Sequence, residues 1–505
     1  MLNNRSIFFA LIAVGAVALS LWRLSQTAAG LTVEVVTVGA TPATVMRMTR
    51  AAPAPVVVIA HGFSGSRQLM APLATTLARN GYVAVTFDFS GHGRNPTPMP
   101  GGLVDLGKST EALLADIENV VRYARALPGG DGRVALAGHS MATDLVVRAG
   151  IRDPQIAAVA ALSFFAQGVD PERPKNLLVI DGAYESQRLI DSGAGVVAQA
   201  AGGPASPGVT YGDLSRGTGR RLALARGAEH IGVLYANDTM TETLDWMNAV
   251  FDRTGKNYID ARGKWLALLF AGLIALMRPL AQLLPQVASV PLGAGLSWRR
   301  LAPVAVAPAL LTPLLLWKIP TDFLPILLGD YLTVHLALYG LLTFAGLWLM
   351  RGDTSAFRPP HWAPLLIAAV CVAAFYTLAL GLPLDAYVVS FLPTDARAPL
   401  IPVIFVGCAL YFLADEWLTR GPGAARGGYA FSKFCFVASL AIAVALNPRR
   451  LFFLVIIMLV IVILLTVYGL VGKWVYARTR DPRAGALGAA FGLAWALSVT
   501  FPIVD

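Results

Sequence analysis

The segment Val134–Ala142, with the sequence VALAGHSMA, joins an apolar run to a serine and then to an amphipathic stretch. The apolar run before Gly138 predicts a buried strand, and the residues from Met141 onward predict a helix. A serine in a sharp turn between a strand and a helix projects its hydroxyl above the edge of the sheet. Small residues flank such a turn because its backbone segments pack closely. We therefore predict that Ser140 is a nucleophile.

A second apolar run, Val56–Ala60, ends in His61 and Gly62, which open a loop before a predicted helix. Backbone N–H groups from such a loop and from the residue after the nucleophile can bind the oxyanion of an acyl-transfer intermediate. The candidate donors are Phe63 and Met141. We interpret His61 as structural rather than as a base, because it ends the strand and its loop contributes backbone N–H groups.

Two later strands are predicted at Asn176–Ile180 and Leu222–Arg226. The first is followed by Asp181 and Glu185, and the second by His230. A serine is a weak nucleophile until a base accepts its proton, and a carboxylate fixes the tautomer of that base. The chain order serine, acid, histidine suits this chemistry. His230 is therefore the predicted base, and either carboxylate could orient it.

Residues 50–252 resemble the α/β-hydrolase superfamily, and within it the compact esterases and dienelactone-hydrolase-like proteins. The resemblance rests on the serine turn, the His-Gly loop, the order of the three predicted residues and the stretch Asp88–Arg94, DFSGHGR. The turn reads Gly-x-Ser-x-Ala where the family has a final glycine. The resemblance implies an α/β fold with a mostly parallel sheet and no cofactor or metal. It favours Glu185 over Asp181, because the family's acid comes three residues after a strand-terminal glycine, here Gly182.

The composition requires a non-aqueous environment for part of the chain. Hydrophobic residues make up 56% and charged residues 14% of the 505 positions, whereas soluble chains carry roughly 25% charged residues. A first membrane span is predicted at 6–22. Eight more are predicted at 265–284, 301–317, 331–350, 362–382, 399–418, 429–446, 451–471 and 485–503. The predicted domains are an anchor (1–30), an α/β-hydrolase domain (31–255) and an all-α multi-span domain (256–505).

The basic residues predict the orientation of these spans. With a cytoplasmic amino terminus, the inside loops hold 10 Lys and Arg and the outside loops hold 4, as the positive-inside rule favours. The inside loops are 285–300, 351–361, 419–428 and 472–484. The net charge of +10 is thus a topology signal and not a nucleic-acid surface. We predict an integral protein of a bacterial inner membrane, with the hydrolase domain on the extracytoplasmic side.

The predicted function is hydrolysis of a small-molecule or lipid ester through an acyl-enzyme. An acyltransferase with the same triad is one alternative, and a transporter or scaffold with a non-catalytic hydrolase-like domain is another. The spans show no obvious charged relay, which argues against ion-coupled transport. Asp330, Asp415 and Glu416 are predicted at the membrane interface. His335, inside a span, is either functional or a neutral, hydrogen-bonded side chain. Protein partners are not predicted.

Overall fold

A computed structural model describes residues 4–50, 52–254, 257–350 and 360–505. The chain divides into two compact units, which we describe separately. The sheet unit comprises Leu19–Leu268, Leu384–Ser390 and Pro502–Asp505, and the helical unit comprises Met1–Ala18, Leu269–Pro383 and Phe391–Phe501. The predicted boundary between residues 255 and 256 lies outside the described residues.

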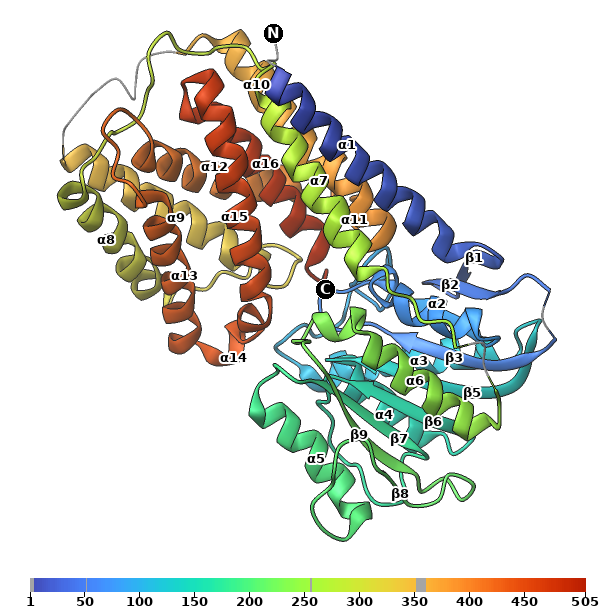
Figure 1. Cartoon of the computed structure of the whole chain (residues 1–505). Helices are drawn as coiled ribbons and strands as arrows, with labels where there is room; N and C mark the ends of the chain where they lie inside the picture. The colour runs from blue at the N-terminus through green and yellow to red at the C-terminus, as the bar shows by residue number, and fades with distance from the viewer. Residues whose placement is uncertain (1–3, 51, 255–256, 351–359) are drawn as a thin grey trace. The chain divides into compact units, whose positions relative to one another are not determined.

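The sheet unit is built on a single sheet with the order β1-β2-β4-β3-β5-β6-β7-β9-β8 in the described part of the chain (Figure 1). The strands are β1 (Leu31–Val38), β2 (Thr41–Met48), β3 (Ala54–Ala60), β4 (Val83–Phe87), β5 (Gly130–His139), β6 (Ile156–Leu162), β7 (Leu177–Gly182), β8 (Thr210–Tyr211) and β9 (Arg220–Ala225). The central strands from β4 to β9 pair in parallel, while β1, β2 and β8 add antiparallel edges. The predicted mostly parallel α/β sheet is confirmed.

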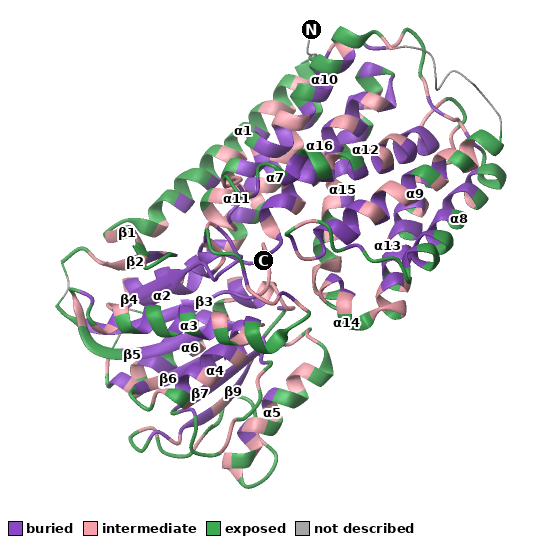
Figure 2. Ribbon diagram, turned by 180° about the vertical axis from the view of Figure 1, so that it is seen from behind, coloured by how far each residue is buried: buried purple, intermediate pink, exposed green. Residues whose placement is uncertain are grey.

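Helices cover both faces of this sheet. They are α2 (Ala71–Arg79), α3 (Leu106–Arg125), α4 (Ala142–Arg152), α5 (Gln187–Ala201) and α6 (Asn237–Phe251), with short 3₁₀ turns η1 (Gln26–Ala28), η2 (Arg67–Met70) and η3 (Gly232–Tyr235). α3 packs beside α4, and α2 packs beside α6. Every residue of β3, β4 and β7 is buried (Figure 2). Continuous burial is expected for parallel strands that are covered on both faces.

The remaining helices are largely apolar. They are α1 (Asn4–Ser25), α7 (Gly263–Ala281), α8 (Trp298–Leu316), α9 (Gly329–Leu349), α10 (Trp362–Ala374), the π-helical segment η5 (Phe375–Leu380), α11 (Gly381–Tyr387), α12 (Leu400–Thr419), α13 (Gly428–Leu446), α14 (Pro448–Leu451), α15 (Phe453–Thr479) and α16 (Pro482–Thr500). Eight of the helical stretches among the described residues are long and apolar enough to cross a membrane. They coincide with the predicted spans except the last, at 485–503, which corresponds to α16 and is not among the eight.

Asp415 and Glu416, which are predicted at the membrane interface, do not face outward from the protein. Both side chains are buried within the helical unit, at 2% and 3% exposure. Asp415 pairs with Lys433 of α13, and Glu416 pairs with Arg420 one helical turn along α12. A buried carboxylate is stable only when it is paired and hydrogen-bonded, so partners from the same helix and from a neighbouring helix account for their position.

Candidate active site

Ser140 lies in the turn between β5 and α4. Its φ of 54° is in the left-handed region, which a non-glycine residue adopts only when the surrounding structure imposes it. The Ser140 N–H donates to Leu162 O over 2.9 Å. The Ser140 carbonyl accepts from Thr143 N–H and from the Thr143 hydroxyl, over 2.8 and 2.7 Å. A β-carbon on Gly138 would lie 2.7 Å from Ala142 O. The predicted small residue is therefore sterically required at position 138.

His230 connects the serine to a carboxylate. It lies in the loop that follows β9, and its Nε2 is 2.9 Å from Ser140 Oγ. Its Nδ1 is 2.7 Å from Glu185 Oε1. The Glu185 carboxylate accepts a hydrogen bond from Nδ1–H, which leaves Nε2 to accept the serine proton. The His230 side chain is 26% exposed, so the reacting edge of the group is open to solvent.

Glu185 is held from behind. Its side chain is 2% exposed, and its second carboxylate oxygen accepts from Gly182 N–H over 3.1 Å. The Glu185 N–H in turn donates to Gly182 O over 3.0 Å, which closes a tight turn at the end of β7. The two bonds fix the direction of the carboxylate before it meets His230. The sequence contained the strand-terminal glycine but gave no sign of this second oxygen contact.

Asp181, the alternative acid, lies elsewhere. One of its oxygens accepts from Phe164 N–H over 2.7 Å, and the other has no hydrogen-bond partner among the described residues. The pKa of Asp181 is raised to about 7, mainly by burial and to a smaller extent by the charge of Glu185. No hydrogen bond in the described part of the chain joins Asp181 to His230. The structure thus places Glu185, and not Asp181, against the imidazole.

Two other histidines support the site through backbone contacts. His61 Nε2 accepts from Phe89 N–H over 3.2 Å, and its Nδ1 lies 2.8 Å from Gly62 O. Complete burial lowers the pKa of His61, so the neutral, structural role predicted for this residue agrees with its contacts. His139 Nε2 donates to His230 O over 2.9 Å. Burial lowers the pKa of His139 to about 3, and the neutral ring therefore anchors the backbone of the predicted base.

The loop after β3 lies against the nucleophile. A β-carbon on Gly62 would be 3.1 Å from Ser140 Cβ, so the two residues are in direct contact. The predicted oxyanion donors, Phe63 and Met141, are the residues that immediately follow these two. Further along the loop, the Arg67 backbone N–H and guanidinium both bind a buried carboxylate, Asp88, over 2.7 and 2.6 Å. The sequence analysis quoted Asp88 but did not predict that it anchors this loop.

Comparisons with known proteins agree with the fold. Residues 51–180 match the family model of serine aminopeptidase, S33. Similar solved structures include one described as a predicted CIB-like hydrolase from Thermoplasma acidophilum (16% identity, TM-score 0.33, covering 43% of this chain and 98% of that one). A dienelactone hydrolase from Anabaena variabilis has 16% identity and a TM-score of 0.32, and the match covers 43% of this chain and 96% of that one. Est1E from Butyrivibrio proteoclasticus has 14% identity and a TM-score of 0.32, and the match covers 45% of this chain and 100% of that one. A search of the curated proteins finds no match. The family model and the order of the mostly parallel sheet support an α/β-hydrolase-like domain in the sheet unit.

Proposed function

We propose that the protein is a membrane-anchored serine hydrolase that cleaves a carboxylic ester. The observation that carries the proposal is the unbroken connection Ser140 Oγ, His230 Nε2, His230 Nδ1, Glu185 Oε1, with contacts of 2.9 and 2.7 Å. Groups that act as nucleophile, base and orienting acid need this geometry. It joins three residues that lie far apart in the sequence, at the carboxyl ends of three parallel strands.

In the proposed mechanism, Ser140 Oγ attacks the acyl carbon while its proton passes to His230 Nε2. The imidazolium then gives that proton to the departing alkoxide as the ester C–O bond breaks, which leaves an acyl-serine. Water then attacks the acyl carbon while its proton passes to His230 Nε2. The imidazolium returns a proton to Ser140 Oγ as the acyl–serine bond breaks, which releases the acid. Glu185 stabilises the imidazolium in both halves. The N–H groups of Phe63 and Met141 would bind the oxyanion of each tetrahedral intermediate.

The membrane placement is supported by the path of the chain. The chain returns to the sheet unit at Leu384–Ser390 and again at Pro502–Asp505. Four long helical passes precede the first return (α7, α8, α9 and α10–α11), and four precede the second (α12, α13, α15 and α16). An even number of crossings brings a chain back to one side of a bilayer. This agrees with the predicted topology, in which α16 also counts as a span although it is not among the eight helical stretches named above.

This placement favours a lipid or another membrane-soluble acyl ester as substrate. An active site tethered to a bilayer meets such esters at a high local concentration, by the same argument that gives linked binding sites a high effective concentration. The bias of Lys and Arg toward the opposite loops supports an extracytoplasmic position for the sheet unit. Short-chain and long-chain acyl esters presented in mixed micelles would measure this preference.

The test of the triad is covalent labelling of the purified full-length protein with a fluorophosphonate, which reacts with activated serines. Ser140→Ala should abolish labelling. Glu185→Gln should slow it at least a hundredfold, because the imidazolium loses its counter-charge. Asp181→Asn is the matched control and should label at close to the wild-type rate. Wild-type protein that does not label, or a larger loss with Asp181→Asn than with Glu185→Gln, would contradict the proposed triad.

Substrate profiling then separates the chemistries that share this triad. Ester hydrolysis should exceed cleavage of aminoacyl amides, the bond class named for the matching peptidase family. Preferential amide cleavage would overturn the ester assignment and leave the triad intact. Product analysis with added alcohol or amine acceptors distinguishes hydrolysis from acyl transfer, because an acyltransferase forms a new ester or amide in place of the free acid.

A further inference from the structure

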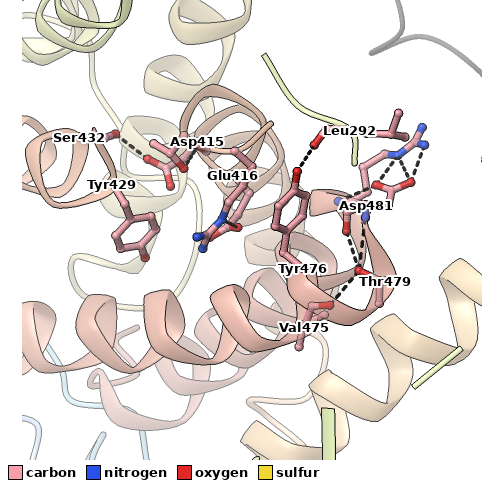
Figure 3. Close-up of polar contacts among 12 residues, drawn as sticks. Leu292, Asp415, Glu416, Tyr429, Ser432, Val475, Tyr476, Thr479 and Asp481 are labelled. Atoms are coloured by element: carbon pink, nitrogen blue, oxygen red, sulfur yellow. Dashed lines mark hydrogen bonds and ion pairs between the residues drawn. The ribbon is translucent and has the colours of Figure 1, made fainter. Parts of the chain in front are cut away.

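A buried group of charged side chains lies at the carboxyl end of α12, inside the helical unit. Asp415 accepts from the Ser432 hydroxyl over 2.6 Å (Figure 3). Asp415 also pairs with Lys433 of α13. Glu416 pairs with Arg420 through two bonds of 2.8 and 3.1 Å. Two carboxylates and two cations thus neutralise one another in this apolar unit. Ionisable groups within membrane spans are rare and often mark pathways for ions and protons, and a buried ion pair adds little net stability to a fold.

A second polar group surrounds His335, in the amino-terminal half of α9. His335 is fully buried. Its Nδ1 is 3.2 Å from the Tyr331 hydroxyl, and its Nε2 is 3.1 Å from Ser439 Oγ of α13. A histidine with hydroxyl groups at both nitrogens can take a proton at one nitrogen and release one from the other.

Aromatic rings lie between the two groups. The Tyr339 hydroxyl donates to Ala305 O over 3.3 Å. Transfer of a proton between His335 and Tyr411 therefore requires this hydroxyl to turn away from that carbonyl. The Tyr339 ring lies 6.5 Å from the His335 ring and 5.7 Å from the Tyr411 ring, between centroids. The Tyr411 hydroxyl accepts from Lys433 Nζ over 3.2 Å. We call the series Tyr331, His335, Tyr339, Tyr411, Lys433 and Asp415 the polar file. Each of its members bears a group that can both gain and lose a proton.

The length of the polar file is a large part of the thickness of the hydrocarbon core of a bilayer. Glycines let α9 and α12 touch: a β-carbon on Gly340 would collide with the backbone of Leu410, and one on Gly407 with the backbone of Thr333. The two helices therefore run parallel, with position 340 level with 410. Following α9 from 331 to 340 and then α12 from 411 to 415 gives a rise of roughly 20 Å at 1.5 Å per residue. The hydrocarbon core of a bilayer is about 30 Å thick.

An independent feature points to the same place. Tyr376 lies in the π-helical segment η5, and π-helical turns recur at functional sites. Its side chain is 5% exposed, its hydroxyl has no hydrogen-bond partner among the described residues, and it is within electrostatic range of Glu416. A buried hydroxyl without a partner costs roughly 1–3 kcal/mol. It adds a hydrogen-bonding group beside the charged end of the polar file that no protein atom uses.

We propose that the helical unit conducts protons along the polar file. A proton enters from water at one end, and every N–H or O–H bond that forms along the file is matched by one that breaks. One proton then leaves at the other end, and no oxidant or reductant is needed. The compensated pairs at Asp415 and Glu416 keep the resting file neutral, which lowers the cost of charges in an apolar unit. The proposal rests on the proposed membrane placement and is independent of the hydrolytic chemistry.

The test is proton flux into vesicles. Full-length protein is reconstituted into phosphatidylcholine–phosphatidylglycerol vesicles that contain pyranine, and a potassium gradient with valinomycin sets the membrane potential. Wild-type protein should acidify or alkalinise the lumen at least tenfold faster than protein-free vesicles, in the direction that the potential sets. Ser140→Ala should keep that rate, so failure of the hydrolase proposal and failure of the proton proposal are distinguishable.

Two variants remove the polar file by different routes. Asp415→Asn with Lys433→Met deletes the buried pair without leaving a lone charge, a change that folds tolerate. His335→Gln can still hydrogen-bond Tyr331 and Ser439 but cannot pass a proton between two nitrogens. Each should lower the flux at least tenfold while its elution on size-exclusion chromatography stays that of the wild type.

Ser498→Ala is the matched control, because this buried hydroxyl bonds only Ala494 O of its own helix over 2.7 Å. It should keep the wild-type flux. Wild-type flux equal to that of empty vesicles would overturn the proposal. So would wild-type flux in both the double variant and His335→Gln, since the buried charges would then serve packing alone.

Discussion

Wild-type Asp181 should lower the free energy of unfolding as pH rises, and Asp181→Asn should remove this pH dependence. Asp181 is fully buried, and burial raises its pKa from 3.8 to about 7. The folded protein therefore keeps this proton up to about pH 7, whereas the unfolded chain releases it near pH 4. Between these values the folded state binds more protons, so the free energy of unfolding falls as pH rises. The shift corresponds to about 4 kcal/mol in total, of which about 2.5 kcal/mol falls between pH 5 and pH 8.

The wild-type profile alone would not isolate this effect. Burial lowers the pKa of His139 from 6.5 to about 3, and a depressed histidine makes the fold more stable as pH rises toward 6.5. The two groups act in opposite directions over part of the range. Because His139 is present in both proteins, the difference between Asp181→Asn and wild type contains only the aspartate. That difference should grow in favour of the variant by about 2.5 kcal/mol from pH 5 to pH 8.

Amide hydrogen exchange, read by mass spectrometry on peptides that cover β7, measures the free energy of opening in the detergent-solubilised full-length protein. Rates are corrected for intrinsic exchange at each pH. Asp213→Asn, which changes an exposed loop carboxylate, should leave the wild-type pH dependence in place between pH 5 and 8. A difference between Asp181→Asn and wild type that stays constant across this range would show that Asp181 is ionised throughout, and the reasoning from burial would be refuted.

Two further predictions concern the loop beside the nucleophile. Gly62→Ala should slow fluorophosphonate labelling at least tenfold, because its β-carbon would press on the nucleophile at 3.1 Å, whereas Gly195→Ala meets no atom within 4 Å and should label normally; equal rates would contradict the contact. Asp88→Asn removes the buried partner of Arg67. It should lower the free energy of unfolding by about 3–5 kcal/mol, as measured by urea unfolding that is monitored through fluorophosphonate labelling. Asp238→Asn, which breaks an exposed pair, should cost less than about 1 kcal/mol, and similar costs for both would refute the argument from burial.

The central strands were predictable because each is a short apolar run that is buried on both faces. The strands predicted at 56–60, 176–180 and 222–226 agree with β3, β7 and β9 within two residues at each end. The sequence analysis did not predict β1 and β2. β1 is an edge strand that pairs only with β2, and most of its residues are partly or fully exposed, so no continuous apolar run marks it. It also missed α5, which buries only Gly193 and Val197 and therefore has little apolar periodicity.

The order of the site residues was readable from the sequence, but the choice between two carboxylates was a matter of backbone path. Asp181 is still part of β7, so its side chain enters the core at Gly193, where a β-carbon would lie 2.7 Å from its Oδ2. Glu185 comes after a turn that Gly182 makes possible. A β-carbon on Gly182 would lie 2.6 Å from Ala228 O, in the loop that carries His230. That close approach brings the Glu185 turn to the imidazole. The contact between these two loops cannot be predicted from the spacing of residues in the sequence.

The polar file escaped the sequence analysis for a related reason. Hydropathy gives the depth of a residue along a span but not its rotation about the helix axis, so Asp415 and Glu416 looked interfacial. Their burial depends on close helix approach: a β-carbon on Gly472 of α15 would lie 3.0 Å from Glu416 Oε1. Lys433 comes from another helix, and pairing hides both charges from a hydropathy average. The sequence analysis treated hydrolase and transporter as competing descriptions of one chain. The structure assigns the catalytic geometry and the buried charges to different units, so evidence for one function does not count against the other.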